Sequence, residues 1–137
     1  SLPFLSLSVF MLTLYPSFPV SFFLSFFLSL FVWFVCSLRV SKWIHLQHGD
    51  AGLRLLFDKA YETLKPHGLF IFEPNLWSSY RKKHKGTAEQ RANFRAIRLL
   101  PTSFPHVLVN EVGFRSYEFR DVELGDGNTT RIYIYRK

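Results

Sequence analysis

The chain has 137 residues, with 17 Lys and Arg against 10 Asp and Glu, and a formal net charge of +7. None of these charges lies in residues 1–38, which contain 9 of the 16 Phe residues. This contrast excludes one uniform domain, and a single cysteine, Cys36, excludes a disulfide scaffold. Residues 39–137 are numerous enough to form a small core.

Residues 1–38 form an apolar, low-complexity tract rich in Ser, Leu, Phe, Val and Pro. Residues 20–38 carry no charge and no proline, and about 20 such residues span a bilayer as a helix. This predicts a transmembrane helix, with Arg39 and Lys42 favouring a cytoplasmic C-terminal side. Two alternatives stay open. One is translated non-coding sequence, because codons for these residues are pyrimidine-rich and the chain does not begin with Met. The other is a buried hydrophobic element.

The first part of residues 39–137 predicts a strand, a helix and a second strand. Residues 40–46 are β-branched and aromatic, which is typical of the end of a strand. Apolar residues recur at helical spacing from Leu53 to Leu64, with Asp50 as a candidate N-cap. Residues 69–72 are continuously apolar, as in a strand covered on both faces. This order predicts a βαβ unit and an α/β fold with a parallel sheet.

The later elements are shorter. A T-x-x-Q pattern at residues 87–90 predicts a capping box and a helix that runs to about residue 99. A short helix is expected in residues 101–109. Residues 114–121 and 131–136 are expected to be strands, separated by turn residues at 125–128.

Basic residues gather between Arg81 and Arg98, with Glu89 the one acid among them. The basic members are Arg81, Lys82, Lys83, Lys85, Arg91, Arg95 and Arg98. Aromatic side chains beside cations are typical of sites for an RNA end, and a solvated basic loop is the alternative. No metal site is predicted, because His45 and His48 have no further ligands at a suitable spacing.

Three segments resemble a known family: SKWIHL at 41–46, GLFIFEPNLWSSY at 68–80 and VGFRSYE at 112–118. They look like the C-terminal half of the bicoid-interacting family of RNA methyltransferases, the methylphosphate capping enzymes. The resemblance implies the later strands of a class I (Rossmann-like) sheet that uses S-adenosylmethionine. It also implies methylation of the 5′-terminal phosphate of a small RNA. The implied location is nuclear or cytoplasmic, or a membrane if residues 20–38 are an anchor.

The resemblance also implies roles for particular residues. Lys42 would be catalytic by holding a phosphate oxygen, which is already an anion, so that methyl transfer needs alignment rather than a strong base. The other implied residues fall into three groups. The RNA-end pocket would contain Trp77, Ser78, Ser79 and Tyr80, the RNA approach would be lined by Arg91, Arg95 and Arg98, and Val40, Ser41 and Glu73 would lie near the cofactor.

The sequence departs from the family pattern in two places. Gln47 and His48 stand where the family has Asn-Trp, and Ala51 stands where an acid is usual. The family's glycine-rich loop and ribose-binding acid should come earlier, yet residues 1–38 contain neither glycine nor acid. We therefore expect this chain alone to be inactive and not to bind S-adenosylmethionine. The alternative function is a membrane-tethered basic module that binds RNA or phosphoinositides without catalysis.

Overall fold

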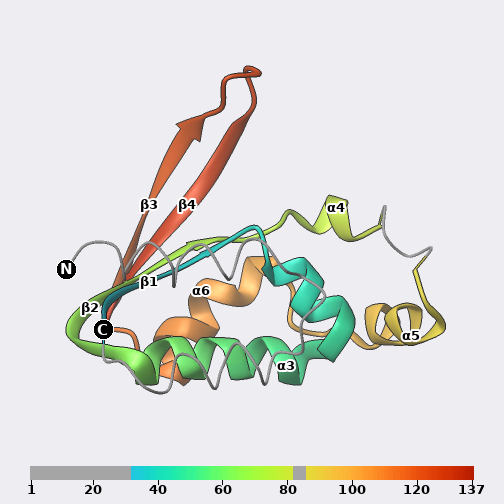
Figure 1. Ribbon diagram of the computed structural model, residues 1–137, viewed down its shortest axis with the longest axis horizontal. Helices are drawn as coiled ribbons and strands as arrows, with labels where there is room; N and C mark the ends of the chain where they lie inside the picture. The colour runs from blue at the N-terminus through green and yellow to red at the C-terminus, as the bar shows by residue number, and fades with distance from the viewer. Residues whose placement is uncertain (1–31, 82–85) are drawn as a thin grey trace.

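The computed structural model describes residues 32–81 and 86–137, which form a mixed α/β fold (Figure 1). The strands are β1 Val32–Leu38, β2 Leu64–Glu73, β3 Ser116–Glu123 and β4 Thr129–Arg136. They form one sheet in the order β1-β2-β4-β3. Strands β1 and β2 are parallel, whereas β4 is antiparallel to both β2 and β3.

The predicted βαβ unit is confirmed, but its first strand lies earlier than expected. Helix α3, Ser41–Thr63, connects the parallel strands β1 and β2. Residues 40–46, expected to be a strand, instead lead into α3 and form its first turns. The strand itself comes from the apolar tract, since Leu38 pairs with Glu73 at the end of the β1–β2 ladder. Residues 32–38 are therefore not part of a transmembrane helix, and residues 20–31 lie outside the described residues.

Helix α3 is broken at Gly49, which explains the loop expected at residues 47–52. Gly49 has φ 68° and ψ −167°, and a positive φ of this kind favours glycine because it has no Cβ. Asp50 follows this break, and its carboxylate bonds to His45, Arg98 and Leu99 rather than capping the helix as predicted. The second part of α3 matches the predicted helix, because Leu53, Leu56 and Phe57 of the expected apolar face are all buried.

An aromatic core lies between α3, the sheet and the segment around α6, Phe104–His106. Figure 1 shows α3 and α6 on the same side of β1 and β2. The ring of Phe57 meets those of Phe70, Phe72 and Phe104 edge-on, at centroid separations of 6.5, 5.5 and 5.5 Å. The apolar face of α3 thus packs against alternate residues of β2, which point to the same side of the sheet.

The chain between β2 and β3 is mostly short helices. These are α4 Trp77–Arg81, α5 Ala88–Ala96, the 3₁₀ turn η1 Pro101–Ser103, α6, and the π-helical η2 Val107–Val112. The capping box of Thr87 and Gln90 is confirmed at the start of α5. Helix α5 ends at Ala96 rather than near residue 99, because the backbone of Ile97 leaves the helical region at φ −60°, ψ 126°.

The β3–β4 hairpin projects beyond the rest of the sheet (Figure 1). Strand β4 pairs with β2 only from Tyr133 to Arg136, opposite residues 69–72. Its first half, residues 129–132, pairs with β3 alone. This half of the hairpin therefore overhangs the loop that follows β2.

Candidate functional site

The carboxyl ends of β1 and β2 lie side by side at one edge of the sheet. Leu38 pairs with Glu73, and the next amide, that of Arg39, donates to the Glu73 carbonyl at 2.9 Å. Parallel strands commonly bind ligands outside this edge. The segment leading to α3 and the loop Pro74–Leu76 both begin here.

Asn75 joins these two segments through its side chain and backbone. Its Oδ1 accepts hydrogen bonds from the Lys42 amide at 3.0 Å and the Ser41 hydroxyl at 3.2 Å. Its own amide donates to Ser41 Oγ at 3.2 Å. Val40, the N-cap of α3, makes no capping hydrogen bond with its side chain. Asn75 therefore caps α3 from a loop that is distant in sequence.

Lys42 lies in the first turn of α3, and not on a strand as expected. Its Nζ is 5.2 Å from the centre of the Trp43 ring. A cation near a helix N-terminus opposes the helix dipole, so helix stability does not account for a lysine here. The ammonium favours an anionic ligand, and the helix dipole adds to this attraction although the first amides are bonded to Asn75 and Val40.

A series of polar side chains, hydrogen-bonded to one another, lies in the same region. His45 is fully buried, with Nε2 2.5 Å from Asp50 Oδ1 and Nδ1 3.2 Å from the Tyr80 hydroxyl. In the neutral tautomer that satisfies both contacts, Nε2–H donates to Asp50 and Nδ1 accepts from Tyr80. The second oxygen of Asp50 accepts from the amides of Arg98 and Leu99 at 2.8 and 3.1 Å. This series of hydrogen bonds thus connects α3, α4 and the segment after α5.

The pKa shifts favour a structural role for these hydrogen-bonded side chains. Burial lowers the pKa of His45 and outweighs the hydrogen bond and charge of Asp50, which raise it. Burial raises the pKa of Asp50, but hydrogen bonds from His45 and the two amides outweigh burial, so the net shift is downward. Burial raises the pKa of Tyr80. At neutral pH His45 is therefore a neutral imidazole, hydrogen-bonded to the Asp50 carboxylate on one side and to the Tyr80 phenol on the other.

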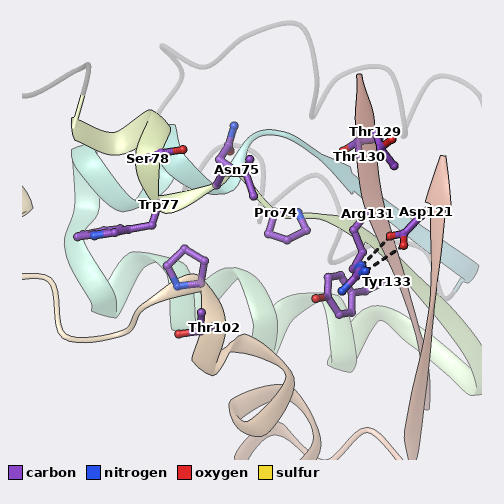
Figure 2. Close-up of a pocket in the computed structure, with 12 residues that line it drawn as sticks. Pro74, Asn75, Trp77, Ser78, Thr102, Asp121, Thr129, Thr130, Arg131 and Tyr133 are labelled. Carbon is purple, nitrogen blue, oxygen red and sulfur yellow. Dashed lines mark hydrogen bonds and ion pairs between the residues drawn. The ribbon is translucent and has the colours of Figure 1, made fainter. Parts of the chain in front are cut away.

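An open cavity of about 610 Å³ lies beside this edge (Figure 2). One wall is the loop and start of α4 after β2, and the opposite wall is the overhanging hairpin, with η1 between them. Among the predicted RNA-end residues, Trp77 and Ser78 line it. Ser79 instead donates its hydroxyl to the Leu76 carbonyl at 2.7 Å, and Tyr80 is fully buried.

Trp77 also packs inside the molecule. Its ring stacks on that of Phe94 in α5, with centroids 5.5 Å apart and planes 13° apart. The Tyr80 ring is 4.9 Å away. With Leu46 and Ile97 these rings form a second, smaller hydrophobic cluster. Trp77 therefore holds α5 in place with part of its surface while another part faces the cavity.

The three residues predicted to lie near the cofactor are all used by the fold. The Glu73 carboxylate accepts from the Thr130 hydroxyl at 2.6 Å and lies 3.6 Å from Arg39 Nε. Ser41 is bonded to Asn75, and Val40 is buried in the core. The polar side chains of Ser41 and Glu73 thus make their contacts within the fold, and their place near the cofactor stays a prediction.

The predicted basic approach is only partly assembled. Arg91 and Arg95 are exposed on α5, and Arg91 donates to the Gly86 carbonyl. Arg98 lies beyond the end of α5 and does not continue their helix face. Lys82, Lys83 and Lys85 lie outside the described residues.

Two further features are absent from residues 32–81 and 86–137. No group of three His, Cys, Asp or Glu side chains in these ranges could hold a metal ion. No helix there is both long and apolar enough to cross a membrane.

The sequence model of the Bicoid-interacting protein 3 (Bin3) family matches residues 33–137, from the start of β1 onward. The chain belongs to the Bin3 family. The membership expected from the three motifs is therefore confirmed. The matched residues include every helix and strand that the structure describes, apart from Val32 at the start of β1.

The Bin3-family relatives include enzymes that act on RNA. A probable RNA methyltransferase of Arabidopsis thaliana is 39% identical over 84 residues, 61% of this chain and 26% of that protein. The 7SK snRNA methylphosphate capping enzyme of Mus musculus is 37% identical over 109 residues, 75% of this chain and 16% of its own length. The U6 snRNA methylphosphate capping enzyme Amus of Drosophila melanogaster is 38% identical over 81 residues, 58% and 27% of the two chains. This chain therefore spans only a small part of each relative.

Sequence reasoning missed Asn75 and the pairing of His45 with Asp50. One signal was present for Asn75: a polar residue directly after a buried strand and a proline. Nothing in the spacing of His45, Asp50 and Tyr80 indicated that they meet, because the helix break at Gly49 brings the first two together.

Proposed function

We propose that this Bin3-family chain is the RNA-end-binding part of a methyltransferase that uses S-adenosylmethionine to methylate the 5′-terminal phosphate of a small RNA. The observation that carries this proposal is the bond between Asn75 and the Lys42 amide. It places a capped helix N-terminus and a lysine next to the loop that lines the cavity. The relatives named for 7SK and U6 snRNA support an RNA substrate of this class and a nuclear location.

The residues of this chain would bind and align the RNA end. The Lys42 ammonium would neutralise one charge of the terminal phosphate, and the dipole of α3 would add a partial positive charge beside it. A phosphate oxygen needs no base to become nucleophilic, so this alignment is the main requirement. His45 and Tyr80 would hold the helix and loop in their relative positions without exchanging protons with the substrate.

S-adenosylmethionine would supply the methyl group, and Ser41 and Glu73 would not be the residues that hold it. This follows from the engagement of Ser41 and Glu73 in bonds within the fold. The parallel β1–α3–β2 unit followed by an antiparallel hairpin supports assignment of the sheet to the later strands of a class I methyltransferase.

The test is RNA binding by the 137-residue chain, measured by fluorescence anisotropy over a range of salt concentrations. Two single-stranded RNAs of one sequence are compared, with a 5′-triphosphate or a 5′-hydroxyl end. On single strands each neutralised phosphate contributes a slope of about −0.7 in log K against log salt. Lys42→Ala should remove about one such unit with the triphosphate RNA and leave binding of the hydroxyl RNA unchanged.

Two controls separate the RNA end from general attraction. Lys65→Ala removes a lysine near the opposite end of β2, and should change neither slope. The double variant Arg91→Ala/Arg95→Ala should flatten both slopes equally, because these residues would contact the RNA backbone rather than its end. Equal binding of the two RNAs by the unmodified chain would refute the proposed function.

A further inference from the structure

The hairpin side of the cavity carries a fixed planar surface that the proposed phosphate site does not use. The Asp121 carboxylate binds Arg131 at two points, with Nε 2.7 Å from Oδ1 and Nη2 2.9 Å from Oδ2. The guanidinium carbon lies 4.2 Å from the centre of the Phe119 ring. Figure 2 shows the Asp121–Arg131 pair beside the Tyr133 ring, at the side of the cavity opposite Trp77.

This surface is preorganised by the strands. Asp121 is paired in register with Arg131, and Phe119 with Tyr133, across the β3–β4 ladder. The Tyr133 ring contacts those of Phe119 and Tyr117 at centroid separations of 6.0 Å in each case. A guanidinium held by a carboxylate and an aromatic ring loses little side-chain freedom when a ligand binds it.

The charge distribution separates two kinds of ligand group. Asp121 neutralises Arg131, so this wall has little attraction for a phosphate. Lys42 and α5 belong to the other side of the cavity, which Asn75 and Trp77 line. Planar cations and aromatic rings instead bind the flat faces of nucleobases. A volume of about 610 Å³ is within the range of small-molecule sites and exceeds what a phosphate needs.

We propose that Arg131 and Tyr133 form a subsite for the first nucleoside of the RNA, with the base against these side chains and the 5′ phosphate directed toward the Lys42 side. This inference rests on the proposed function, which supplies the phosphate site. Thr102, which also lines the cavity between the two walls, would lie nearest the ribose.

The test combines protein variants with a change in the RNA. The 137-residue chain is titrated with 5′-triphosphate RNA whose first nucleotide is either intact or abasic. Removing the base should weaken binding about tenfold, as expected for loss of one stacked base. Arg131→Gln and Tyr133→Leu should each weaken binding of the intact RNA and reduce the effect of removing the base. Arg131 is exposed, so Arg131→Gln tests the subsite even if Tyr133→Leu lowers stability.

Matched controls come from the same hairpin. Val122→Ala removes an exposed apolar side chain that does not line this cavity, and Arg120→Gln removes an arginine paired with Glu118. Both controls should retain the full effect of removing the base. If Arg131→Gln also retains that full effect, the subsite is wrong.

The same titrations separate the two proposals. Tighter binding of triphosphate than of hydroxyl RNA, with no effect of the base, would overturn the subsite and leave the proposed function standing. A base effect that depends on Arg131, with no preference between the two RNA ends, would support a nucleoside site and overturn the proposed function. Absence of any RNA binding would overturn both.

Discussion

The two hydrophobic clusters of this protein differ in what they bury. The larger cluster, between α3 and the sheet, is lined by aromatic and aliphatic side chains such as Phe57, Phe70 and Phe114. The smaller cluster, around Leu46 and Ile97, lies against buried polar groups that bond to one another. Apolar contact is tolerant of small shifts, whereas a buried hydrogen-bond chain is satisfied in only one arrangement.

The difference suggests that the two clusters have separate roles, one in stability and one in the positions of the site segments. Burial of large apolar side chains is the dominant favourable contribution to folding. The polar chain contributes little net stability, because its hydrogen bonds replace bonds to water. It determines instead how α3 and the loop after β2 lie relative to each other, which is what the proposed site requires. The following predictions test this division.

The largest effect should come from the aromatic core. Phe57→Ala should lower the free energy of unfolding by about 4 kcal/mol, because it removes a fully buried ring that meets three others. Urea unfolding followed by circular dichroism measures this change. Leu55→Ala, at an exposed position of the same helix, should cost less than about 0.5 kcal/mol. Similar losses for the two variants would mean that α3 does not pack as described.

A smaller effect is expected at His45. His45→Ala should lower the free energy of unfolding by about 2 kcal/mol, because it leaves Asp50 and the Tyr80 hydroxyl without this partner. The effect on binding of 5′-triphosphate RNA should exceed that of Phe57→Ala, when both variants are compared under conditions in which they remain folded. A larger effect of Phe57→Ala than of His45→Ala on RNA binding would contradict these separate roles.

The lowered pKa of His45 also predicts how the stability of the protein changes in acid. Its pKa is lowered in the folded protein, so below about pH 6.5 the unfolded chain takes up the proton first and stability falls. The lowered pKa of Asp50 adds a second loss in more acid solution. His45→Gln cannot titrate and should show a smaller fall between pH 7 and pH 5. Urea midpoints at the two pH values measure the difference, and equal falls would exclude His45 as its source.

The smallest effect on stability should come from Asn75. Asn75→Ala removes the acceptor that caps α3 and should cost about 1 kcal/mol. Asn75→Asp retains an acceptor oxygen and should restore stability, since a carboxylate is favoured at a helix N-terminus. Chemical denaturation of both variants provides the measurement. A loss in Asn75→Asp equal to that in Asn75→Ala would show that the capping contact is unimportant.

The sequence predicted the elements whose signal is local. The apolar spacing from Leu53 to Leu64 and the capping box at Thr87 each depend on residues within a few turns, and both were confirmed. Strand β1 was misplaced because a strand and a membrane segment have similar apolar composition. The βαβ order was still correct, because α3 and β2 follow in the expected sequence.

The candidate site was harder to predict because its contacts join distant residues. Asn75 meets Lys42 across 33 positions, and Asp50 meets Arg98 across 48. Tyr80 was predicted at the RNA end but is buried, since a motif does not show which side of a short helix faces inward. The hairpin wall was missed because β4 extends past β2 by an amount that only strand register determines.

The long-range cap on α3 also has a kinetic consequence. The second part of α3 can form from its own residues, but the first turn is completed only after the chain has reached Asn75 and β2 has paired. The two ends of one helix thus belong to different cooperative units. The Lys42 amide should exchange its hydrogen when the loop after β2 opens, whereas amides near Phe57 should exchange only on global unfolding.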